Sequence, residues 1–283
     1  MTANTGVAPA RPAASGSGLS FAGIIRSEWI KLRSLRSTVW CYAIIVVITV
    51  GMGVLLASTF SSGGFGTAGG VQLAVQVATI SLSMSVLVSS VLGALVITGE
   101  YGTGMIRSTF TAVPRRIPAL LAKAIVFGLS TFVVGLVSLL ATAAATLPIL
   151  AANGVDVEIG AEFLLPLVGG AGYLALMGVM SLAIGAIIRS SAGGIASSLG
   201  LILVVPTIVG IFGLITQTPW LIDAANYLPS NAGSFMYSVP VGGGVDPLTG
   251  ATTLDPAIGF LVVAAWVAAL LVLSAVLVKR RDS

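Results

Sequence analysis

The chain has 283 residues, of which 57% are hydrophobic and only 8% are charged, and its mean hydropathy is +1.09. Soluble domains carry about 25% charged residues, so this composition excludes a water-soluble fold and predicts an all-α protein that crosses the membrane several times. The chain contains no histidine, which excludes HExxH zinc sites and histidine-based catalytic triads.

The chain divides into two parts. Residues 1–18 are mainly Ala, Ser, Gly, Thr and Pro, and predict a disordered tail, whereas residues 19–283 form one expected transmembrane domain. Within residues 19–38, apolar side chains occupy one helical face and basic or hydroxyl side chains the other, which is typical of an amphipathic helix lying along the inner leaflet. Glu28 interrupts the apolar face. Its carboxylate is expected to pair either with Lys31 on the same helix or with a cation elsewhere in the protein.

Six apolar runs follow, each long enough to cross a hydrocarbon core of about 30 Å. They cover residues 39–60, 71–98, 118–147, 163–188, 192–215 and 257–278. Proline starts the third run and is expected to end it at Pro148, and Pro206 is expected to kink the fifth.

Two features of the last third of the chain are less regular. Ala192, Ala196 and Gly200 form a small-residue ridge, for which packing inside the bundle is favoured over a dimer seam. Residues 216–256 are too apolar for a free loop and too interrupted by proline to form two spans. They predict short re-entrant helices that dip into the outer interface between spans five and six.

The cations are sorted to one side of the membrane. With six spans, all thirteen Lys and Arg residues fall on the face that holds both termini, and the opposite face has none. Positively charged flanks lie on the cytoplasmic side of membrane proteins, so both termini are expected in the cytoplasm. These cations are Arg11, Arg26, Lys31, Arg33, Arg36, Arg107, Arg115, Arg116, Lys123, Arg189, Lys279, Arg280 and Arg281.

The basic segment between the second and third spans, residues 99–123, is expected to be the cytoplasmic face where the protein meets a partner. Glu100 falls at the C-terminal end of the second span, where the helix dipole disfavours an anion. The nearest compensating cations in sequence are Arg107, Arg115 and Arg116. The sequence therefore predicts an ion pair that folds this segment back on itself.

The chain lacks the sequence features by which transporters use ATP or an ion gradient. None of the three lysines lies in a GxxxxGK[ST] phosphate loop, so no ATP hydrolysis of that kind is expected. The middle thirds of the spans lack Asp, Glu, Lys and Arg, the groups that ion-coupled transporters and proton relays use. Any uphill transport should therefore be driven from outside the chain.

Several motifs together resemble one family. The sequence SEWIKLRSLRST (27–38) precedes the first span, and Glu100-Tyr101, Gly104–Arg107 and Pro114–Arg116 follow the second. Leu228-Pro229 precedes the last span, and the chain ends near Lys279–Asp282. In this order and at these positions, the motifs are similar to those of ABC-2-type ABC transporter permeases of bacteria, over roughly residues 20–283.

This resemblance implies a role and a set of partners. Such permeases form homo- or heterodimers in the bacterial cytoplasmic membrane and export drugs, lipids, peptides or polysaccharides, with ATP and Mg²⁺ bound by a separate ATPase subunit. The chain itself is then no enzyme, binds no cofactor or metal, and has membrane lipids but no nucleic acid as further partners. The expected substrate is amphipathic or hydrophobic.

The resemblance also implies site residues. A coupling region that docks on the ATPase would comprise Glu100, Arg107, Pro114, Arg115 and Arg116. The interfacial helix would contribute Glu28, Trp29, Lys31, Arg33 and Arg36, with Glu28 tying this helix to the coupling region.

Two other classes of function are weighed against export. A non-transporting membrane anchor or assembly factor would use the same basic face only to recruit a cytoplasmic protein. An autonomous channel or secondary carrier is disfavoured because the span interiors lack titratable groups.

Overall fold

The computed structural model describes residues 20–60, 70–105, 116–216, 218–239 and 252–281. These ranges contain helices and no strand. The N-terminal half forms α1 (Phe21–Ser34), α2 (Arg36–Phe60), α3 (Gly70–Thr79), α4 (Leu82–Gly102) and α6 (Arg116–Ala152). The C-terminal half forms α7 (Ala161–Ile188), α8 (Ser191–Leu199), the π-helix η1 (Gly200–Val204), α9 (Val205–Thr216), α10 (Pro219–Ala225), α11 (Pro229–Phe235) and α12 (Pro256–Arg281). The tail predicted to be disordered, 1–18, lies outside the described residues.

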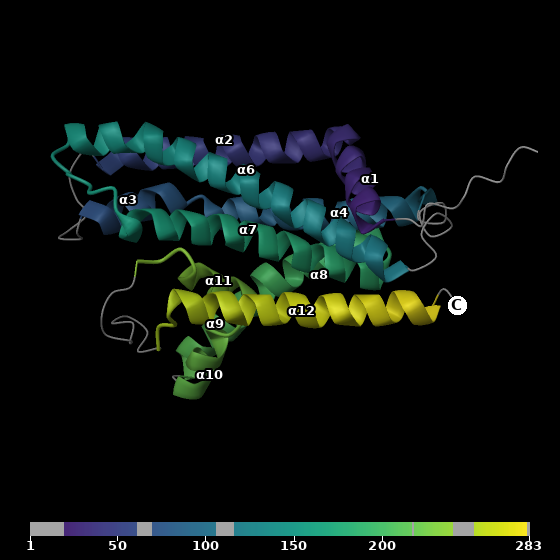
Figure 1. The fold of residues 1–283 in the computed structure, drawn as a ribbon. Helices are drawn as coiled ribbons and strands as arrows, with labels where there is room; N and C mark the ends of the chain where they lie inside the picture. Colours follow the sequence, from purple (N-terminus) through teal and green to yellow (C-terminus); the bar gives the residue numbers. More distant parts are fainter. Residues whose placement is uncertain (1–19, 61–69, 106–115, 217, 240–251, 282–283) are drawn as a thin grey trace, which may run out of the picture.

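Six helical segments are long and apolar enough to cross a membrane, which confirms the predicted all-α, six-span architecture. The long helices run side by side along one direction, and α1 lies across one end of them (Figure 1). The beginning of α1 and the end of α12 lie at that same end, which we call the basic end (Figure 1). An even number of spans requires this arrangement.

Some spans depart from the predicted limits. The second span is two helices, α3 and α4, separated at Ile80 and Ser81. The third span was expected to stop before Pro148, which is wrong, because α6 continues to Ala152 with Pro148 inside it. A proline this close to a helix end removes one backbone hydrogen bond and costs the rest of the helix little. The fifth span contains the π-helix, which ends two residues before Pro206, and the kink at Pro206 stays a prediction.

Helix α7 is the centre of the bundle. In its most apolar stretch 78% of residues are buried, compared with 17% in α2, 11% in α8 to α9 and 22% in α12. The backbone of α4 approaches α7 closely at Gly93, where an added Cβ atom would lie 2.1 Å from the carbonyl oxygen of Gly178. Nearby, Ser89 Oγ donates a hydrogen bond to the Leu174 carbonyl oxygen at 2.9 Å. Glycine therefore sets the spacing of this helix pair, as small residues do in membrane bundles.

Two of the three residues in the small-residue ridge of the fifth span do not pack inside the chain, and the third, Gly200, is half-buried. Ala192 and Ala196 are exposed, and the buried residues of α8 are Gly194 and Ser198 on another face. The prediction that Ala192 and Ala196 pack within the bundle is therefore wrong.

Between the fifth and sixth spans the chain forms the two short helices α10 and α11, and their re-entry into the membrane interface stays a prediction. Helix α11 packs tightly against α7, because a Cβ atom on Gly233 would lie 2.2 Å from the ring of Tyr173. Helix α10 is joined to the chain before α12, where the Thr252 hydroxyl donates to Asp223 Oδ1 at 2.9 Å.

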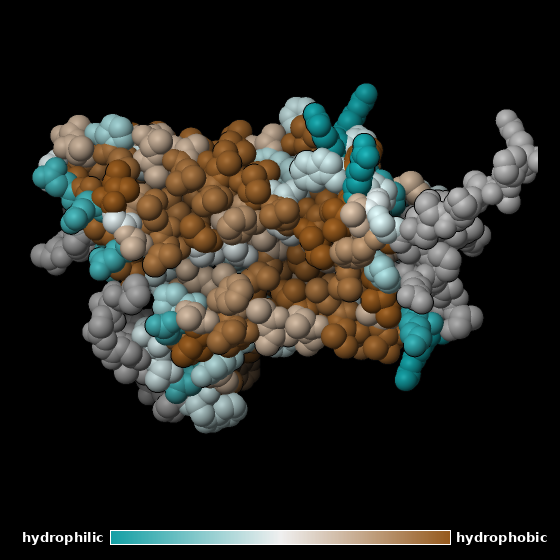
Figure 2. Space-filling model, in the orientation of Figure 1, coloured by the Kyte–Doolittle hydropathy of each residue, from teal (hydrophilic) through white to brown (hydrophobic). Residues whose placement is uncertain are grey.

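The surface follows the same division as the sequence. Hydrophobic side chains cover the length of the helices, while hydrophilic ones gather at the two ends, including over α1 and the C-terminal end of α12 (Figure 2). The end opposite the basic end holds the turn between α6 and α7, which carries Asp156 and Glu158, and the first turn of α7, which carries Glu162. This pattern is that of a membrane-spanning bundle with polar ends.

Candidate functional site

Helix α1 presents a buried stripe to the rest of the protein. It begins at the N-cap Ser20, whose hydroxyl accepts a hydrogen bond from the Gly23 amide, and it ends where Leu35 is extended, before α2 starts. Ile24, Glu28 and Leu32 are buried at four-residue spacing, so they share one face. Trp29 is 49% exposed and faces away from the bundle. A carboxylate therefore occupies the middle of the packed face.

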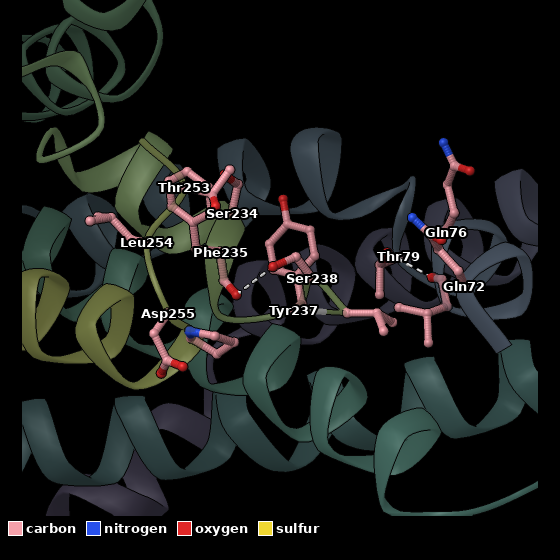
Figure 3. A pocket seen from close by; sticks show the side chains of 13 residues that line it. Gln72, Gln76, Thr79, Ser234, Phe235, Tyr237, Ser238, Thr253, Leu254 and Asp255 are labelled. Atoms are coloured by element: carbon pink, nitrogen blue, oxygen red, sulfur yellow. Dashed lines mark hydrogen bonds between the residues drawn. The ribbon is translucent and has the colours of Figure 1, made fainter. Parts of the chain in front are cut away.

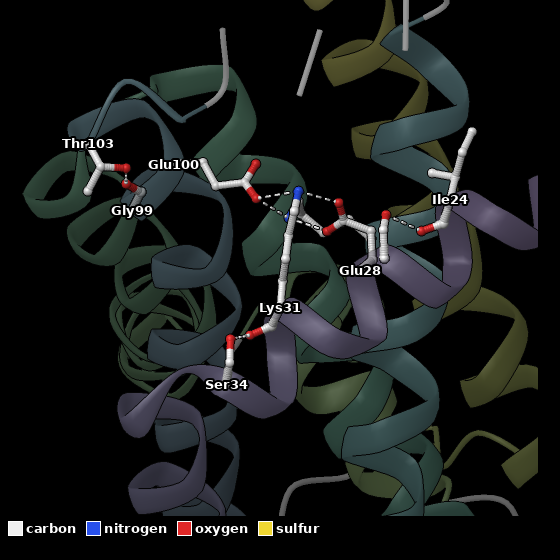
Figure 4. A network of polar contacts seen from close by, with 9 residues as sticks. Ile24, Glu28, Lys31, Ser34, Gly99, Glu100 and Thr103 are labelled. Carbon is white, nitrogen blue, oxygen red and sulfur yellow. Dashed lines mark hydrogen bonds and ion pairs between the residues drawn. The ribbon is translucent and has the colours of Figure 1, made fainter. Parts of the chain in front are cut away.

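Glu28 belongs to a cluster of four charged side chains, which we call the charge cluster: Glu28 and Lys31 of α1, Glu100 of α4 and Lys123 of α6. Lys123 Nζ lies 2.5 Å from Glu28 Oε2 and 2.8 Å from Glu100 Oε1. Lys31 Nζ lies 2.7 Å from Glu28 Oε1 and 3.4 Å from Glu100 Oε1. In Figure 4 the side chain of Lys31 extends from α1 toward the carboxylate of Glu100. Three helices that are distant in sequence are thus joined by ion pairs.

The structure resolves the two alternatives for Glu28, because it pairs both with Lys31 on its own helix and with Lys123 of α6. For Glu100, the cation partners among the described residues are Lys31 and Lys123, and the pairing with the arginines stays a prediction. Arg107, Pro114 and Arg115 lie outside the described residues, and Arg116 is described only as the first residue of α6.

The remaining predicted residues of the interfacial helix take no part in the charge cluster. Arg33 and Arg36 are exposed, as Trp29 is. Lys123 belongs to the charge cluster but was not among the predicted site residues. Its signal in the sequence is its position, since it lies about two helical turns inside the third span, where a lysine needs an anionic partner.

The charge cluster is electrically balanced and largely closed to solvent. The side chains of Glu28, Glu100 and Lys123 are 3%, 5% and 7% exposed, and that of Lys31 is 31% exposed. Two carboxylates and two ammonium groups sum to zero, which is the condition under which buried charges are tolerated. Glu100 also sits in the last turn of α4, where the helix dipole opposes an anion, so the lysines compensate this position.

The ion pairs keep the α1 groups charged. Burial alone would raise the pKa of Glu28, but the charge of Lys123 and its hydrogen bond, together with Lys31, outweigh burial and lower this pKa below its usual 4.5. Burial alone would lower the pKa of Lys31, but its hydrogen bond to Glu28 and the charges of Glu100 and Glu28 raise it above 10.5. Both side chains are therefore ionised at neutral pH.

A second group of contacts lies beside the charge cluster at the basic end. The guanidinium of Arg189, in the turn between α7 and α8, lies 5.2 Å from the ring centre of Tyr101. Ser191 Oγ donates to Thr98 Oγ1 at 3.0 Å. The last turns of α4 therefore contact α1 and α6 through Glu100, and the α7–α8 turn through Thr98 and Tyr101.

Helix α4 ends directly after these contacts. Gly104 has a positive φ of 72°, a conformation that glycine adopts without strain, and its amide donates to the Tyr101 carbonyl. The connection to α6 begins there. Any displacement of this connection acts first on the turn that carries Glu100.

Two cavities lie at opposite ends of the bundle. One, of about 500 Å³, adjoins the charge cluster and has an apolar floor from α4 and α6. The other, of about 530 Å³, lies between α3 and the chain around α11 and the start of α12. Figure 3 shows Gln72, Gln76 and Thr79 on one side of this second cavity, and Ser234, Thr253 and Asp255 on the other. Among the described residues, no group of three or more Cys, Asp or Glu side chains is placed to hold a metal ion.

The sequence matches a known family over much of its length. Residues 24–210, well over half of the chain, match the family described as "ABC-2 family transporter protein". A comparison with curated proteins returns no significant match. The matched region begins in α1 and includes all four residues of the charge cluster, together with the first four spans and most of the fifth. The chain therefore belongs to the ABC-2 family of transporter proteins, as the permease, the membrane-spanning component of an ABC transporter.

Proposed function

We propose that this permease exports an amphipathic or hydrophobic substrate across the cytoplasmic membrane and that a separate ATPase subunit, which docks on the connection between α4 and α6, supplies the energy. The observation that supports this proposal is the position of Glu100. It lies in the last turn before that connection and is paired to Lys31 of α1 and Lys123 of α6.

The charge cluster offers a physical route for the coupling. Removing one member of a buried ion pair costs about 3–5 kcal/mol, so the helices that share these pairs tend to move together rather than separate. A partner that pushes on the connection would shift Glu100, and with it α1 and α6. In an alternative arrangement with the pairs separated, water would solvate the charged groups. This hydration lowers the free-energy cost of that arrangement. The cluster thus favours two discrete states over a continuous deformation.

The interior of the bundle supports an apolar path. Some of its hydroxyl groups bond one another, as Tyr42 does with Ser130 at 2.8 Å and Thr49 with Ser85 at 3.1 Å. Transport without charged groups in the mid-membrane suits molecules that partition into lipid, and it requires energy from elsewhere. A second permease copy, identical or similar, would complete the transporter.

The test uses the full chain with its ATPase in inverted membrane vesicles, and it measures ATP-dependent uptake of fluorescent amphiphiles. Reversing both charges of the connection with the double variant R115E/R116E should abolish ATP-dependent uptake. The matched control K279E/R280E reverses two charges at the same end of the bundle, on α12, and should retain it.

The same experiment separates export from the other classes. A membrane anchor or assembly factor would bind the ATPase and support no ATP-dependent uptake in any variant. Uptake that persists in R115E/R116E, or that proceeds in liposomes without an ATPase, would refute the proposed coupling.

A further inference from the structure

We propose that the cavity beside the charge cluster binds a membrane lipid whose headgroup carries a primary ammonium next to a phosphate. This cavity, which we call the elbow cavity, has a volume of about 500 Å³ and lies under the bend between α1 and α2, against α4 and α6. It adjoins the start of the connection on which the ATPase is proposed to dock, because Met105 is part of its lining.

The lining of the elbow cavity has an apolar part and a charged part. Its apolar side chains include Leu92, Leu95 and Val96 of α4, and Val126 and Phe127 of α6. All four members of the charge cluster line the other part. A cavity with hydrocarbon on one side and paired charges on the other fits a ligand that is itself amphipathic.

The elbow cavity reaches the molecular surface. Three exposed residues also line it: Leu35 in the bend between α1 and α2, Ser37 at the start of α2, and Met105 just after α4. This region is the basic end, where α1 is expected to lie along the leaflet. A lipid could enter sideways without crossing the bundle.

One polar atom of the charge cluster lacks a partner. Glu100 Oε1 accepts from both lysines, whereas Glu100 Oε2 is buried and has no hydrogen-bond partner among the described residues. Leaving a buried carboxylate oxygen without a donor is costly. A primary ammonium supplies N–H donors for this oxygen, whereas a quaternary ammonium has none.

Charge balance selects the rest of the headgroup. The charge cluster is neutral, so a ligand with a net positive or negative charge would leave an uncompensated charge in apolar surroundings. A zwitterion avoids this cost. Its phosphate would lie near Lys31, which is the least buried member of the cluster, while its ammonium would face Glu100.

The experiment measures which lipids stay bound to the purified full-length chain, by native mass spectrometry after exchange into bilayers with equal parts of three lipids. The lipids share their acyl chains and carry phosphoethanolamine, phosphocholine or phosphoglycerol headgroups. We expect retention of the phosphoethanolamine lipid over the phosphocholine lipid by about tenfold, the value of one hydrogen bond to a charged group. Equal retention of these two lipids would overturn the proposal.

Two variants test the mechanism. E100Q leaves the cluster with a net positive charge, so the preference should pass from the phosphoethanolamine to the anionic phosphoglycerol lipid, and an unchanged ranking would contradict the proposal. E162Q makes the same substitution on α7 at the opposite end of the bundle and should keep the wild-type ranking.

A further variant guards against misfolding of E100Q. L95W fills the elbow cavity without altering any charge, and it should lower the retention of all three lipids while its elution as a folded species stays unchanged. Undiminished retention in L95W would place the lipid elsewhere and refute this site. Because no ATPase is present, the outcome is independent of the proposed coupling.

Discussion

Replacing Lys123 with methionine removes one ammonium group from the charge cluster while keeping most of the side-chain volume. Glu28 and Glu100 then remain buried, at 3% and 5% side-chain exposure, with Lys31 as the cation left among the described residues near them. Breaking a buried pair in this way costs about 3–5 kcal/mol. For a chain of this size, that loss corresponds to a fall in melting temperature of roughly 6–20 °C.

The double variant K123M/E100Q separates loss of charge balance from loss of packing. It removes one cation and one anion, and it leaves the Glu28–Lys31 pair, whose atoms lie 2.7 Å apart. We expect it to recover at least about 2 kcal/mol relative to K123M, which is within the range measured for coupled neighbours. K279M, on the exposed end of α12, should change stability by less than about 0.5 kcal/mol.

The measurement is thermal unfolding of the purified variants in one detergent, followed by tryptophan fluorescence at matched concentration. The reasoning is refuted if K123M melts with wild type, since the buried carboxylates would then not need this cation. It is also refuted if K123M/E100Q melts no higher than K123M.

Three further predictions concern packing, pH and topology. At the α4–α7 contact, G93L should destabilise the bundle by about 1–3 kcal/mol, because its side chain would overlap the Gly178 backbone. In the control G99A the added Cβ meets no atom within 4 Å, so this variant should have the wild-type melting temperature. Equal melting temperatures of the two variants would contradict the close contact. Stabilisation by Glu28, whose pKa is lowered, is lost only as pH falls through that pKa below 4.5, and stabilisation by Lys31 only as pH rises through its raised pKa above 10.5. Amide hydrogen exchange of α1, corrected for the intrinsic rate, should therefore stay constant between these limits, and a transition inside this window would show that another group controls the contact. In a C41A background, N153C in the turn after α6 should react with an impermeant thiol reagent from outside the cell, and S34C on α1 only after the membrane is opened; reversed labelling would invert the orientation.

Much of the architecture could be predicted because it is encoded along the chain. Span length follows from runs of apolar residues, and the gathering of α1 and the C-terminal end of α12 at one end follows from an even number of spans. The unusual position of Glu28 on an apolar helical face was visible for the same reason. These features require no knowledge of which helices touch.

The charge cluster could be anticipated only in part, because its partners come from tertiary packing. Glu100 was expected to find a cation nearby in sequence, and the close packing of α4, α6 and α1 brings Lys123 and Lys31 to it, two partners that were not predicted. The same limit applies to α8, where sequence spacing suggested Ala192 and Ala196 as packed residues and the structure buries Gly194 and Ser198. A stripe of small residues shows where close contact is possible, but one helix can carry such stripes on several faces.

The break between α3 and α4 shows a different limit. Ile80 and Ser81 contain neither glycine nor proline, the residues by which helix interruptions are recognised. Neither Ile80 nor Ser81 ends the apolar run, so the sequence predicted one continuous span.

The length of α6 has a mechanical consequence. With 37 residues at about 1.5 Å each, it is a rod of about 55 Å, compared with a hydrocarbon core of about 30 Å. Lys123 is near one end of this rod, and the turn bearing Asp156 follows the other. Tilting such a lever by about 5° about its basic end swings the far tip by about 5 Å. A small rearrangement of ion pairs on one side of the bilayer is thereby amplified into a displacement, on the opposite side, wide enough to admit a water molecule.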